Sequence, residues 1–85
     1  MNRLHLSLYK KWFDEILNGT KKTEYRELKP FYERRLSKQY EEVKFVNGYG
    51  KERPFVVLKI LGITRSSKFF EIHLGEIIDS GKIKS

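Results

Sequence analysis

The sequence predicts a small α+β domain in which about five short strands form a mixed β-barrel and two short helices plug its ends. The chain has 85 residues, enough for one domain with a single modest core, so residues 1–85 are expected to form one unit. Its apolar residues repeat in some stretches with the period of two typical of strands, and in others with the helical period. The resulting order, β-α-β-α-β-β-β, has too few strands for two packed sheets and favours one strongly curved sheet.

The first strand and the first helix are predicted at the start of the chain. In RLHLSL at 3–8, leucines alternate with polar residues, which is typical of a strand with one buried side. Apolar residues then recur at helical spacing, namely Tyr9, Trp12, Phe13, Ile16 and Leu17. The helix is predicted from Lys10 to Asn18, because a glycine such as Gly19 commonly ends a helix. Trp12 is expected near the edge of a cleft, since its indole N–H needs a partner.

The second half of the fold follows from similar patterns. A strand is predicted over 20–27, and a helix over 30–40 because Pro30 suits a first helical turn. The later strands are expected at 42–46, 55–64 and 69–78. Asn47 and Gly48 are predicted to form a hairpin turn after the first of these. The β-branched stretch 55–64 is expected at the centre of the sheet, and the tail from residue 80 is expected to be frayed.

Composition narrows the classes of function. The chain has no cysteine, which excludes disulfides and thiolate metal sites, and no metal or cofactor is predicted. The longest apolar runs are far shorter than the roughly 20 residues of a membrane span, and the N-terminal stretch lacks the apolar region of a signal peptide. A soluble, cytoplasmic protein is therefore expected. The net charge is +7, and a basic balance favours nucleic acid or another polyanion as partner.

The octapeptide GTKKTEYR at 19–26 is the first candidate site. Lys22, Glu24 and Arg26 share one face of the predicted strand, and a turn or bulge at Gly19 would bring Lys21 to the same place. Lysine and arginine suit phosphate, whereas glutamate accepts a hydrogen bond from an exocyclic amino group of a base. Lys21 and Glu24 would also suit proton transfer in catalysis. The alternative is an exposed strand face with ion pairs across the strands.

Other residues give weaker signals. Tyr49 would suit stacking on an unpaired base, with Lys51 and Arg53 meeting phosphate, but NGYG also reads as a plain hairpin turn. Glu71 or Glu76 would complete a carboxylate pair with Glu24, and spacing selects neither. The two histidines, His5 and His73, lie on the polar sides of strands and are interpreted as incidental.

The octapeptide resembles the G-x-K-x-x-E-x-R signature of ASCH domains at all four defined positions: Gly19, Lys21, Glu24 and Arg26. Its setting is similar too, after an amphipathic helix containing WFDEIL and before a helix opened by Pro30. VKFVNGYG and the HLG at 73–75 resemble later landmarks of short ASCH proteins. The resemblance covers roughly residues 3–78.

This resemblance implies a PUA-like barrel with a cleft lined by Lys21, Glu24 and Arg26, and a role with RNA or a nucleotide. Some members of the family hydrolyse an N-acetylated cytidine with a lysine, a threonine and a glutamate, and others are ribonucleases. In the first group threonine takes the signature's acidic position, where this chain has Glu24, and Thr23 faces the other side of the strand.

Three hypotheses follow from the sequence. The first is a module that binds RNA or a nucleotide in the cleft, with Lys22, Tyr49 and Arg53 on its rim. The second is a small hydrolase that uses Lys21 and Glu24. The third is a protein-interaction domain that presents a basic helix at Arg34 and Arg35. The sequence gives no indication of oligomeric state.

Overall fold

The computed structural model describes residues 2–48 and 52–84. The elements follow one another in the predicted order, as β1 (Arg3–Leu8), α1 (Lys10–Leu17), β2 (Thr23–Glu27), α2 (Pro30–Leu36), β3 (Glu42–Asn47), β4 (Glu52–Arg65) and β5 (Phe69–Lys84). The predicted class, a small α+β fold with five strands and two short helices, is confirmed at this level. In the described residues no helix has the length and apolarity needed to cross a bilayer.

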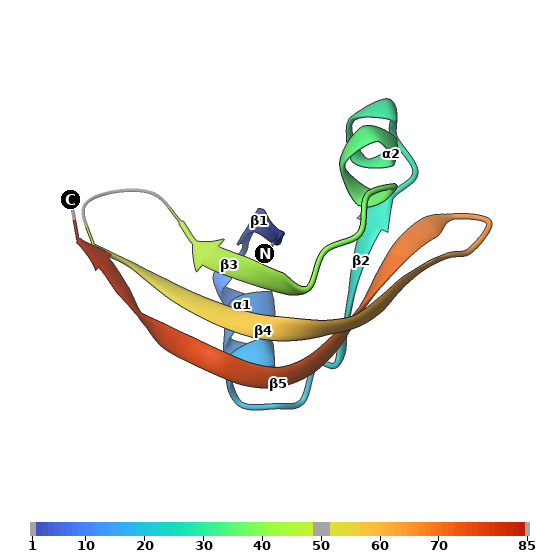
Figure 1. Cartoon of the computed structure of the whole chain (residues 1–85). Helices are drawn as coiled ribbons and strands as arrows, with labels where there is room; N and C mark the ends of the chain where they lie inside the picture. The colour runs from blue at the N-terminus through green and yellow to red at the C-terminus, as the bar shows by residue number, and fades with distance from the viewer. Residues whose placement is uncertain (1, 49–51, 85) are drawn as a thin grey trace.

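The five strands form one curled sheet in the order β1-β3-β4-β5-β2. β1 pairs with β3 in parallel, and the other neighbours are antiparallel. β4 lies at the centre, as its β-branched sequence predicts, and with β5 it forms a long bent ribbon that gives the sheet its curl (Figure 1). The curl stops short of closure because the two edge strands, β1 and β2, are not paired with each other. The sheet is therefore a half-barrel with a seam between β1 and β2.

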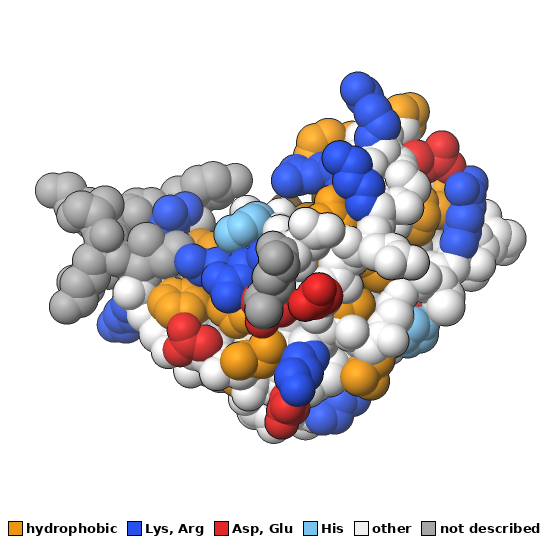
Figure 2. Space-filling view, viewed as in Figure 1, with side chains coloured by type: hydrophobic (Ala, Val, Ile, Leu, Met, Phe, Trp, Pro, Cys, Tyr) orange, Lys and Arg blue, Asp and Glu red, His pale blue; other side chains and the backbone are white. Residues whose placement is uncertain are grey.

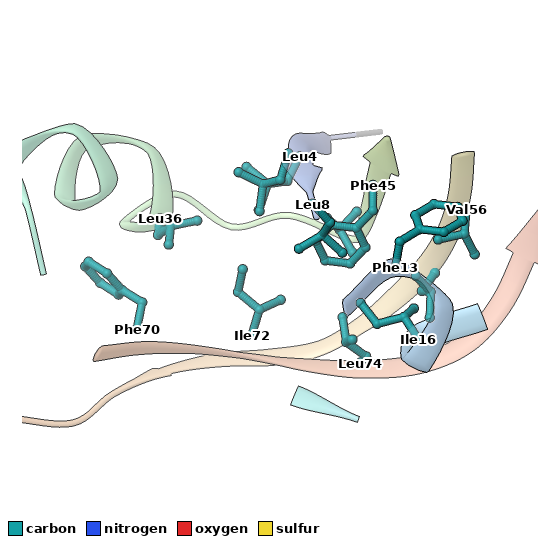
Figure 3. Close-up of a cluster of buried hydrophobic side chains, with 13 residues drawn as sticks. Leu4, Leu8, Phe13, Ile16, Leu36, Phe45, Val56, Phe70, Ile72 and Leu74 are labelled. Carbon is teal, nitrogen blue, oxygen red and sulfur yellow. The ribbon is translucent and has the colours of Figure 1, made fainter. Parts of the chain in front are cut away.

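The core fills the inside of this curl (Figure 3). The alternating leucines of β1 are all buried, and so are the alternating apolar residues of β5 at Phe70, Ile72 and Leu74. From α1, only Phe13 and Ile16 are buried. The rest of the predicted helical stripe is exposed, and its residues are Tyr9, Trp12 and Leu17.

Several predicted boundaries are wrong. The second strand begins at Thr23 and not at residue 20, since the N–H groups of Thr20 and Lys21 donate to the carbonyl of Glu15 at the end of α1. The second helix ends at Leu36 and not at residue 40, since the chain must turn there to reach β3 beside β1. The Ser37 hydroxyl donates to the carbonyl of Arg34 at this end. The tail is paired and not frayed through residue 84, because the backbone of residues 80–84 pairs with that of residues 52–56 of β4.

Candidate functional site

A closed turn after α1 places the octapeptide. Gly19 has the left-handed φ of 86° that its sequence position predicts. Its N–H donates to the carbonyl of Ile16 (3.1 Å), and the N–H of Thr20 donates to the carbonyl of Glu15 (2.9 Å). These two bonds form a Schellman motif, which satisfies carbonyls that the helix end leaves free. The N–H of Lys21 donates to the same Glu15 carbonyl (3.0 Å), so Lys21 is held directly against the end of α1.

β2 then turns Glu24 and Arg26 toward the inside of the half-barrel. Glu24 pairs across the ladder with Ile72, and Arg26 pairs with Phe70. Directly paired residues of antiparallel strands point to the same side of the sheet, and Ile72 and Phe70 point into the core. Glu24 is accordingly only 6% exposed. The alternative of an exposed strand face with ion pairs does not describe this face of β2.

Lys21, Glu24 and Arg26 form one charged cluster. Oε2 of Glu24 lies 2.8 Å from both Nε and Nη2 of Arg26. Oε1 lies 3.4 Å from Nζ of Lys21. The side chains of Lys21 and Arg26 are each 14% exposed, and that of Glu24 is 8% exposed. One carboxylate thus lies between two cations in a place that water hardly reaches.

Arg26 also joins the two edges of the half-barrel. Its Nη2 donates to the carbonyl of Ser7 on β1 (2.9 Å), and its Nη1 donates to the hydroxyl of Tyr32 on α2 (3.0 Å). With the bond to Glu24, the planar guanidinium connects β2 to β1 and α2 at once. This structural role was not predicted, because Ser7 and Arg26 are far apart in the sequence.

A cleft of about 700 Å³ opens at this seam. Its lining is rich in aromatic rings and cations, and consists of Ser7, Leu8, Tyr9, Lys10, Trp12, Glu24, Tyr25, Arg26, Glu27, Lys29, Tyr32, Asn47 and Gly48. Tyr9 is 83% exposed, and Trp12 is at the cleft as its indole predicts. Lys21 lies beside the cleft, where its Nζ is 5.0 Å from the ring centre of Trp12 and 5.5 Å from that of Tyr25.

The cleft includes residues that the sequence did not indicate. Tyr9, Lys10, Lys29 and Tyr32 come from the start of α1 and from α2 with its preceding loop. These segments meet at the seam only in the folded chain, so no local sequence pattern predicts that their residues line the cleft. The sequence pattern places Tyr9 in the apolar stripe of the helix, yet Tyr9 is 83% exposed and lines the cleft.

Several predicted site residues lie elsewhere. Lys22 is exposed and is not part of the cleft lining, and its carbonyl accepts from the N–H of Leu74. Arg53 is half-buried on β4, away from the cleft lining. Tyr49 and Lys51 lie outside the described residues. The predicted binding set is therefore represented at the cleft by Glu24 and Arg26, with Lys21 beside it.

Asn47 and Gly48, the predicted turn residues, differ in backbone conformation. Gly48 has a left-handed φ of 75°, whereas Asn47 has a negative φ and is the last residue of β3. A two-residue Asn-Gly turn needs positive φ at both positions, so this turn is not formed. Instead, the side-chain amide of Asn47 donates to the carbonyl of Leu8 (3.0 Å), which ties β3 to the end of β1 at the cleft.

Neither late acid joins Glu24 among the described residues. Glu71 accepts a hydrogen bond from the Thr64 hydroxyl (2.9 Å), which also lies 2.7 Å from Nε2 of His73. Glu76 forms an exposed ion pair with Lys59 (3.0 Å). Within the same part of the chain, no group of His, Asp and Glu side chains is arranged to hold a metal ion.

Comparison with known proteins finds no family model, no curated protein and no solved structure that matches the chain. The likeness to ASCH domains therefore depends on the octapeptide and on the order of elements around it.

Proposed function

We propose that this chain is a PUA-like ASCH domain that binds RNA or a nucleotide in the cleft at the seam between β1 and β2. The observation that carries the proposal is the lining of the cleft, which combines four aromatic residues (Tyr9, Trp12, Tyr25 and Tyr32) with three cations (Lys10, Arg26 and Lys29) and two carboxylates (Glu24 and Glu27). Aromatic rings stack on bases, and lysine and arginine meet phosphates. A cleft of about 700 Å³ is within the usual size of ligand sites.

The cluster beneath the cleft has a positioning role in this proposal. Arg26 already donates to Glu24, Ser7 and Tyr32, so most of its N–H groups are engaged. Phosphate contacts therefore fall mainly to Lys10 and Lys29, whose side chains are 79% and 62% exposed. Their ion pairs, with Asp14 at 2.6 Å and with Glu27 at 3.4 Å, are open to water and can be exchanged for phosphate. Glu24 presents a carboxylate at the floor of the cleft as an acceptor for an amino group of a base.

The net charge of the chain supports a polyanionic ligand. On the face shown in Figure 2, Lys and Arg side chains lie over several elements and Asp and Glu side chains are fewer. The chain as a whole carries +7. Such a charge raises the rate and strength of association with nucleic acid at low salt.

The test is fluorescence anisotropy of a labelled single-stranded RNA over a series of salt concentrations. Binding should weaken with salt, with a slope of about −0.7 in log–log form for each phosphate contacted. Lys29→Gln removes one contact, so it should weaken binding and reduce the slope by about that amount. Lys59→Gln is the matched control, because Lys59 is 59% exposed and forms a similar exposed ion pair on β4.

Two results would contradict the proposal. One is absence of binding at low salt by a protein that is folded. The other is an equal effect of Lys29→Gln and Lys59→Gln, which would mean that general charge and not the cleft attracts the RNA.

A hydrolase that uses the same cleft is the second candidate. The observation in its favour is the Lys21 to Glu24 contact of 3.4 Å between two side chains that are largely buried. Such a pair would suit proton transfer to or from a nucleoside or RNA held in the cleft. Mass spectrometry of N-acylated cytidine and of labelled RNA after incubation would test it. Turnover no greater than that of a Glu24→Gln control would exclude this reaction.

A further inference from the structure

Two aromatic residues form a platform on the outer face of the sheet, next to the cleft. The rings of Tyr25 on β2 and Phe69 on β5 meet edge to face, with their centres 5.9 Å apart. Tyr25 is 50% exposed and Phe69 is 39% exposed. Single exposed apolar residues are ordinary, but a pair in contact beside a cleft points to a ligand surface.

The register explains why these rings lie together outside the half-barrel. Phe69 pairs directly with Glu27, and Glu27 is two residues from Tyr25 along β2. Tyr25, Glu27 and Phe69 therefore share the outer face, opposite to the inner face that carries Glu24. β2 is an edge strand, so a ligand can reach from the cleft to this platform by crossing the free edge of β2.

Tyr25 connects the two surfaces. It lines the cleft as well as contacting Phe69. The ammonium of Lys21 lies near the rings of both Trp12 and Tyr25, at 5.0 and 5.5 Å from their centres. A cation at this distance from a ring is attracted to it, which holds both rings in place beside a largely buried lysine. Lys21 thus lies near both cleft rings, Trp12 and Tyr25, and Tyr25 contacts Phe69 on the outer face.

Two carboxylates that can meet a base lie beside the platform. Glu71 is the residue paired with Tyr25, and Glu27 is paired with Phe69 and lies 3.4 Å from Nζ of Lys29. Carboxylates accept hydrogen bonds from the amino groups of bases. The cationic side chains that suit phosphate, Lys10 and Lys29, line the cleft.

We infer that the ligand is a single-stranded RNA segment of at least two nucleotides, with one base in the cleft and its neighbour stacked on Tyr25 and Phe69. The inference rests on the proposed function and extends it, because it distinguishes a strand from a mononucleotide. Stacking on aromatic side chains is tolerant of sequence, so the platform lengthens the site without fixing a second base.

Trp12 provides the measurement. It is the one tryptophan in the sequence and it lines the cleft, so its fluorescence reports occupancy without a label. AMP, pApA and pApApA are titrated against the wild-type protein at one salt concentration. The dinucleotide should bind roughly five- to a hundred-and-fiftyfold more tightly than AMP, the gain expected from stacking one more base.

The variants separate the platform from the cleft. Phe69→Leu keeps an apolar side chain and removes the ring. It should therefore abolish most of the difference in affinity between pApA and AMP, while the affinity for AMP stays the same. Tyr25→Phe keeps the ring and should keep the gain. Leu61→Ala, at an exposed apolar position on β4, is the control and should change the affinity for neither AMP nor pApA. Thermal unfolding of each variant shows that the comparison is between folded proteins.

The outcomes distinguish the inference from the function on which it rests. If AMP binds and pApA binds no more tightly, or if Phe69→Leu leaves the gain intact, the platform is refuted and the cleft remains. If none of the nucleotides binds at low salt, both proposals are refuted.

Discussion

Replacement of Glu24 by glutamine tests the charged cluster most severely. Glutamine keeps the size of the side chain but leaves the cations Lys21 and Arg26, each 14% exposed, without a counter-charge. Removing one partner of a buried ion pair costs about 3–5 kcal/mol, and we expect about 3 kcal/mol because the Lys21 amine can move toward water. In a domain of this size, each kcal/mol lowers Tm by about 4–8 °C. Glu24→Gln should therefore lower Tm by about 12–24 °C.

Glu42→Gln is the matched control for this experiment. Glu42 is also buried, at 8% exposure, but Arg3, its one side-chain partner among the described residues, has a side chain that is 42% exposed. An ion pair open to water contributes about 1 kcal/mol or less, so the loss in Tm should stay below about 8 °C. Scanning calorimetry or thermal circular dichroism measures both. If Glu24→Gln lowers Tm no more than Glu42→Gln, Lys21, Glu24 and Arg26 are not a buried cluster whose charges depend on one another.

The remaining stability predictions concern the turn and the seam. Gly19→Ala forces an L side chain into a left-handed φ and should lower the free energy of unfolding by about 1 kcal/mol, whereas Gly62→Ala, with ordinary φ and open space around its Cβ, should change it little. Urea unfolding measures both, and equal effects would contradict the turn assignment. Tyr32→Phe removes an acceptor of Arg26 and should cost about 1 kcal/mol. Tyr40→Phe is its control, because the Tyr40 hydroxyl has no hydrogen bond to the described residues. A larger loss of stability in Tyr40→Phe than in Tyr32→Phe would contradict the role of the Arg26 to Tyr32 hydrogen bond at the seam.

The local part of the fold could be predicted from sequence because it depends on neighbouring residues. The alternation in RLHLSL places three leucines in the core, and Gly19 ends α1 with the expected left-handed φ. The inward set of β5, with Ile72 at its centre, likewise follows from a period of two. These signals involve residues within one element, where spacing alone decides which side chain is buried.

The parts that sequence did not predict depend on partners far along the chain. Residues 80–84 have no strand alternation of their own, and they are ordered in a strand because β4 offers a backbone to pair with. The bond from Arg26 to Ser7 requires that β1 and β2 face each other across the seam, which is a property of the sheet order. The same holds for the cleft, where Lys29 and Tyr9 meet only in the folded chain.

The sequence left open which way the face of the octapeptide that carries Glu24 and Arg26 is turned. The presence of Glu24 and Arg26 on one strand face follows from their spacing, but spacing does not say which face is inside. The ladder partners Ile72 and Phe70 decide this, since they are core residues on the neighbouring strand. A charged pair on the inner face is costly unless its members satisfy each other, which they do here at 2.8 Å.

The most direct test of the account is a ¹⁵N chemical-shift titration of the protein with a short single-stranded RNA. We expect that the amides of residues 9, 10, 12, 24–27 and 29 shift with saturation and that the indole N–H of Trp12 shifts with them, because these residues line the cleft. Shifts confined to α2 around Arg34 and Arg35, with the cleft unchanged, would contradict it and favour a basic helix as the binding surface.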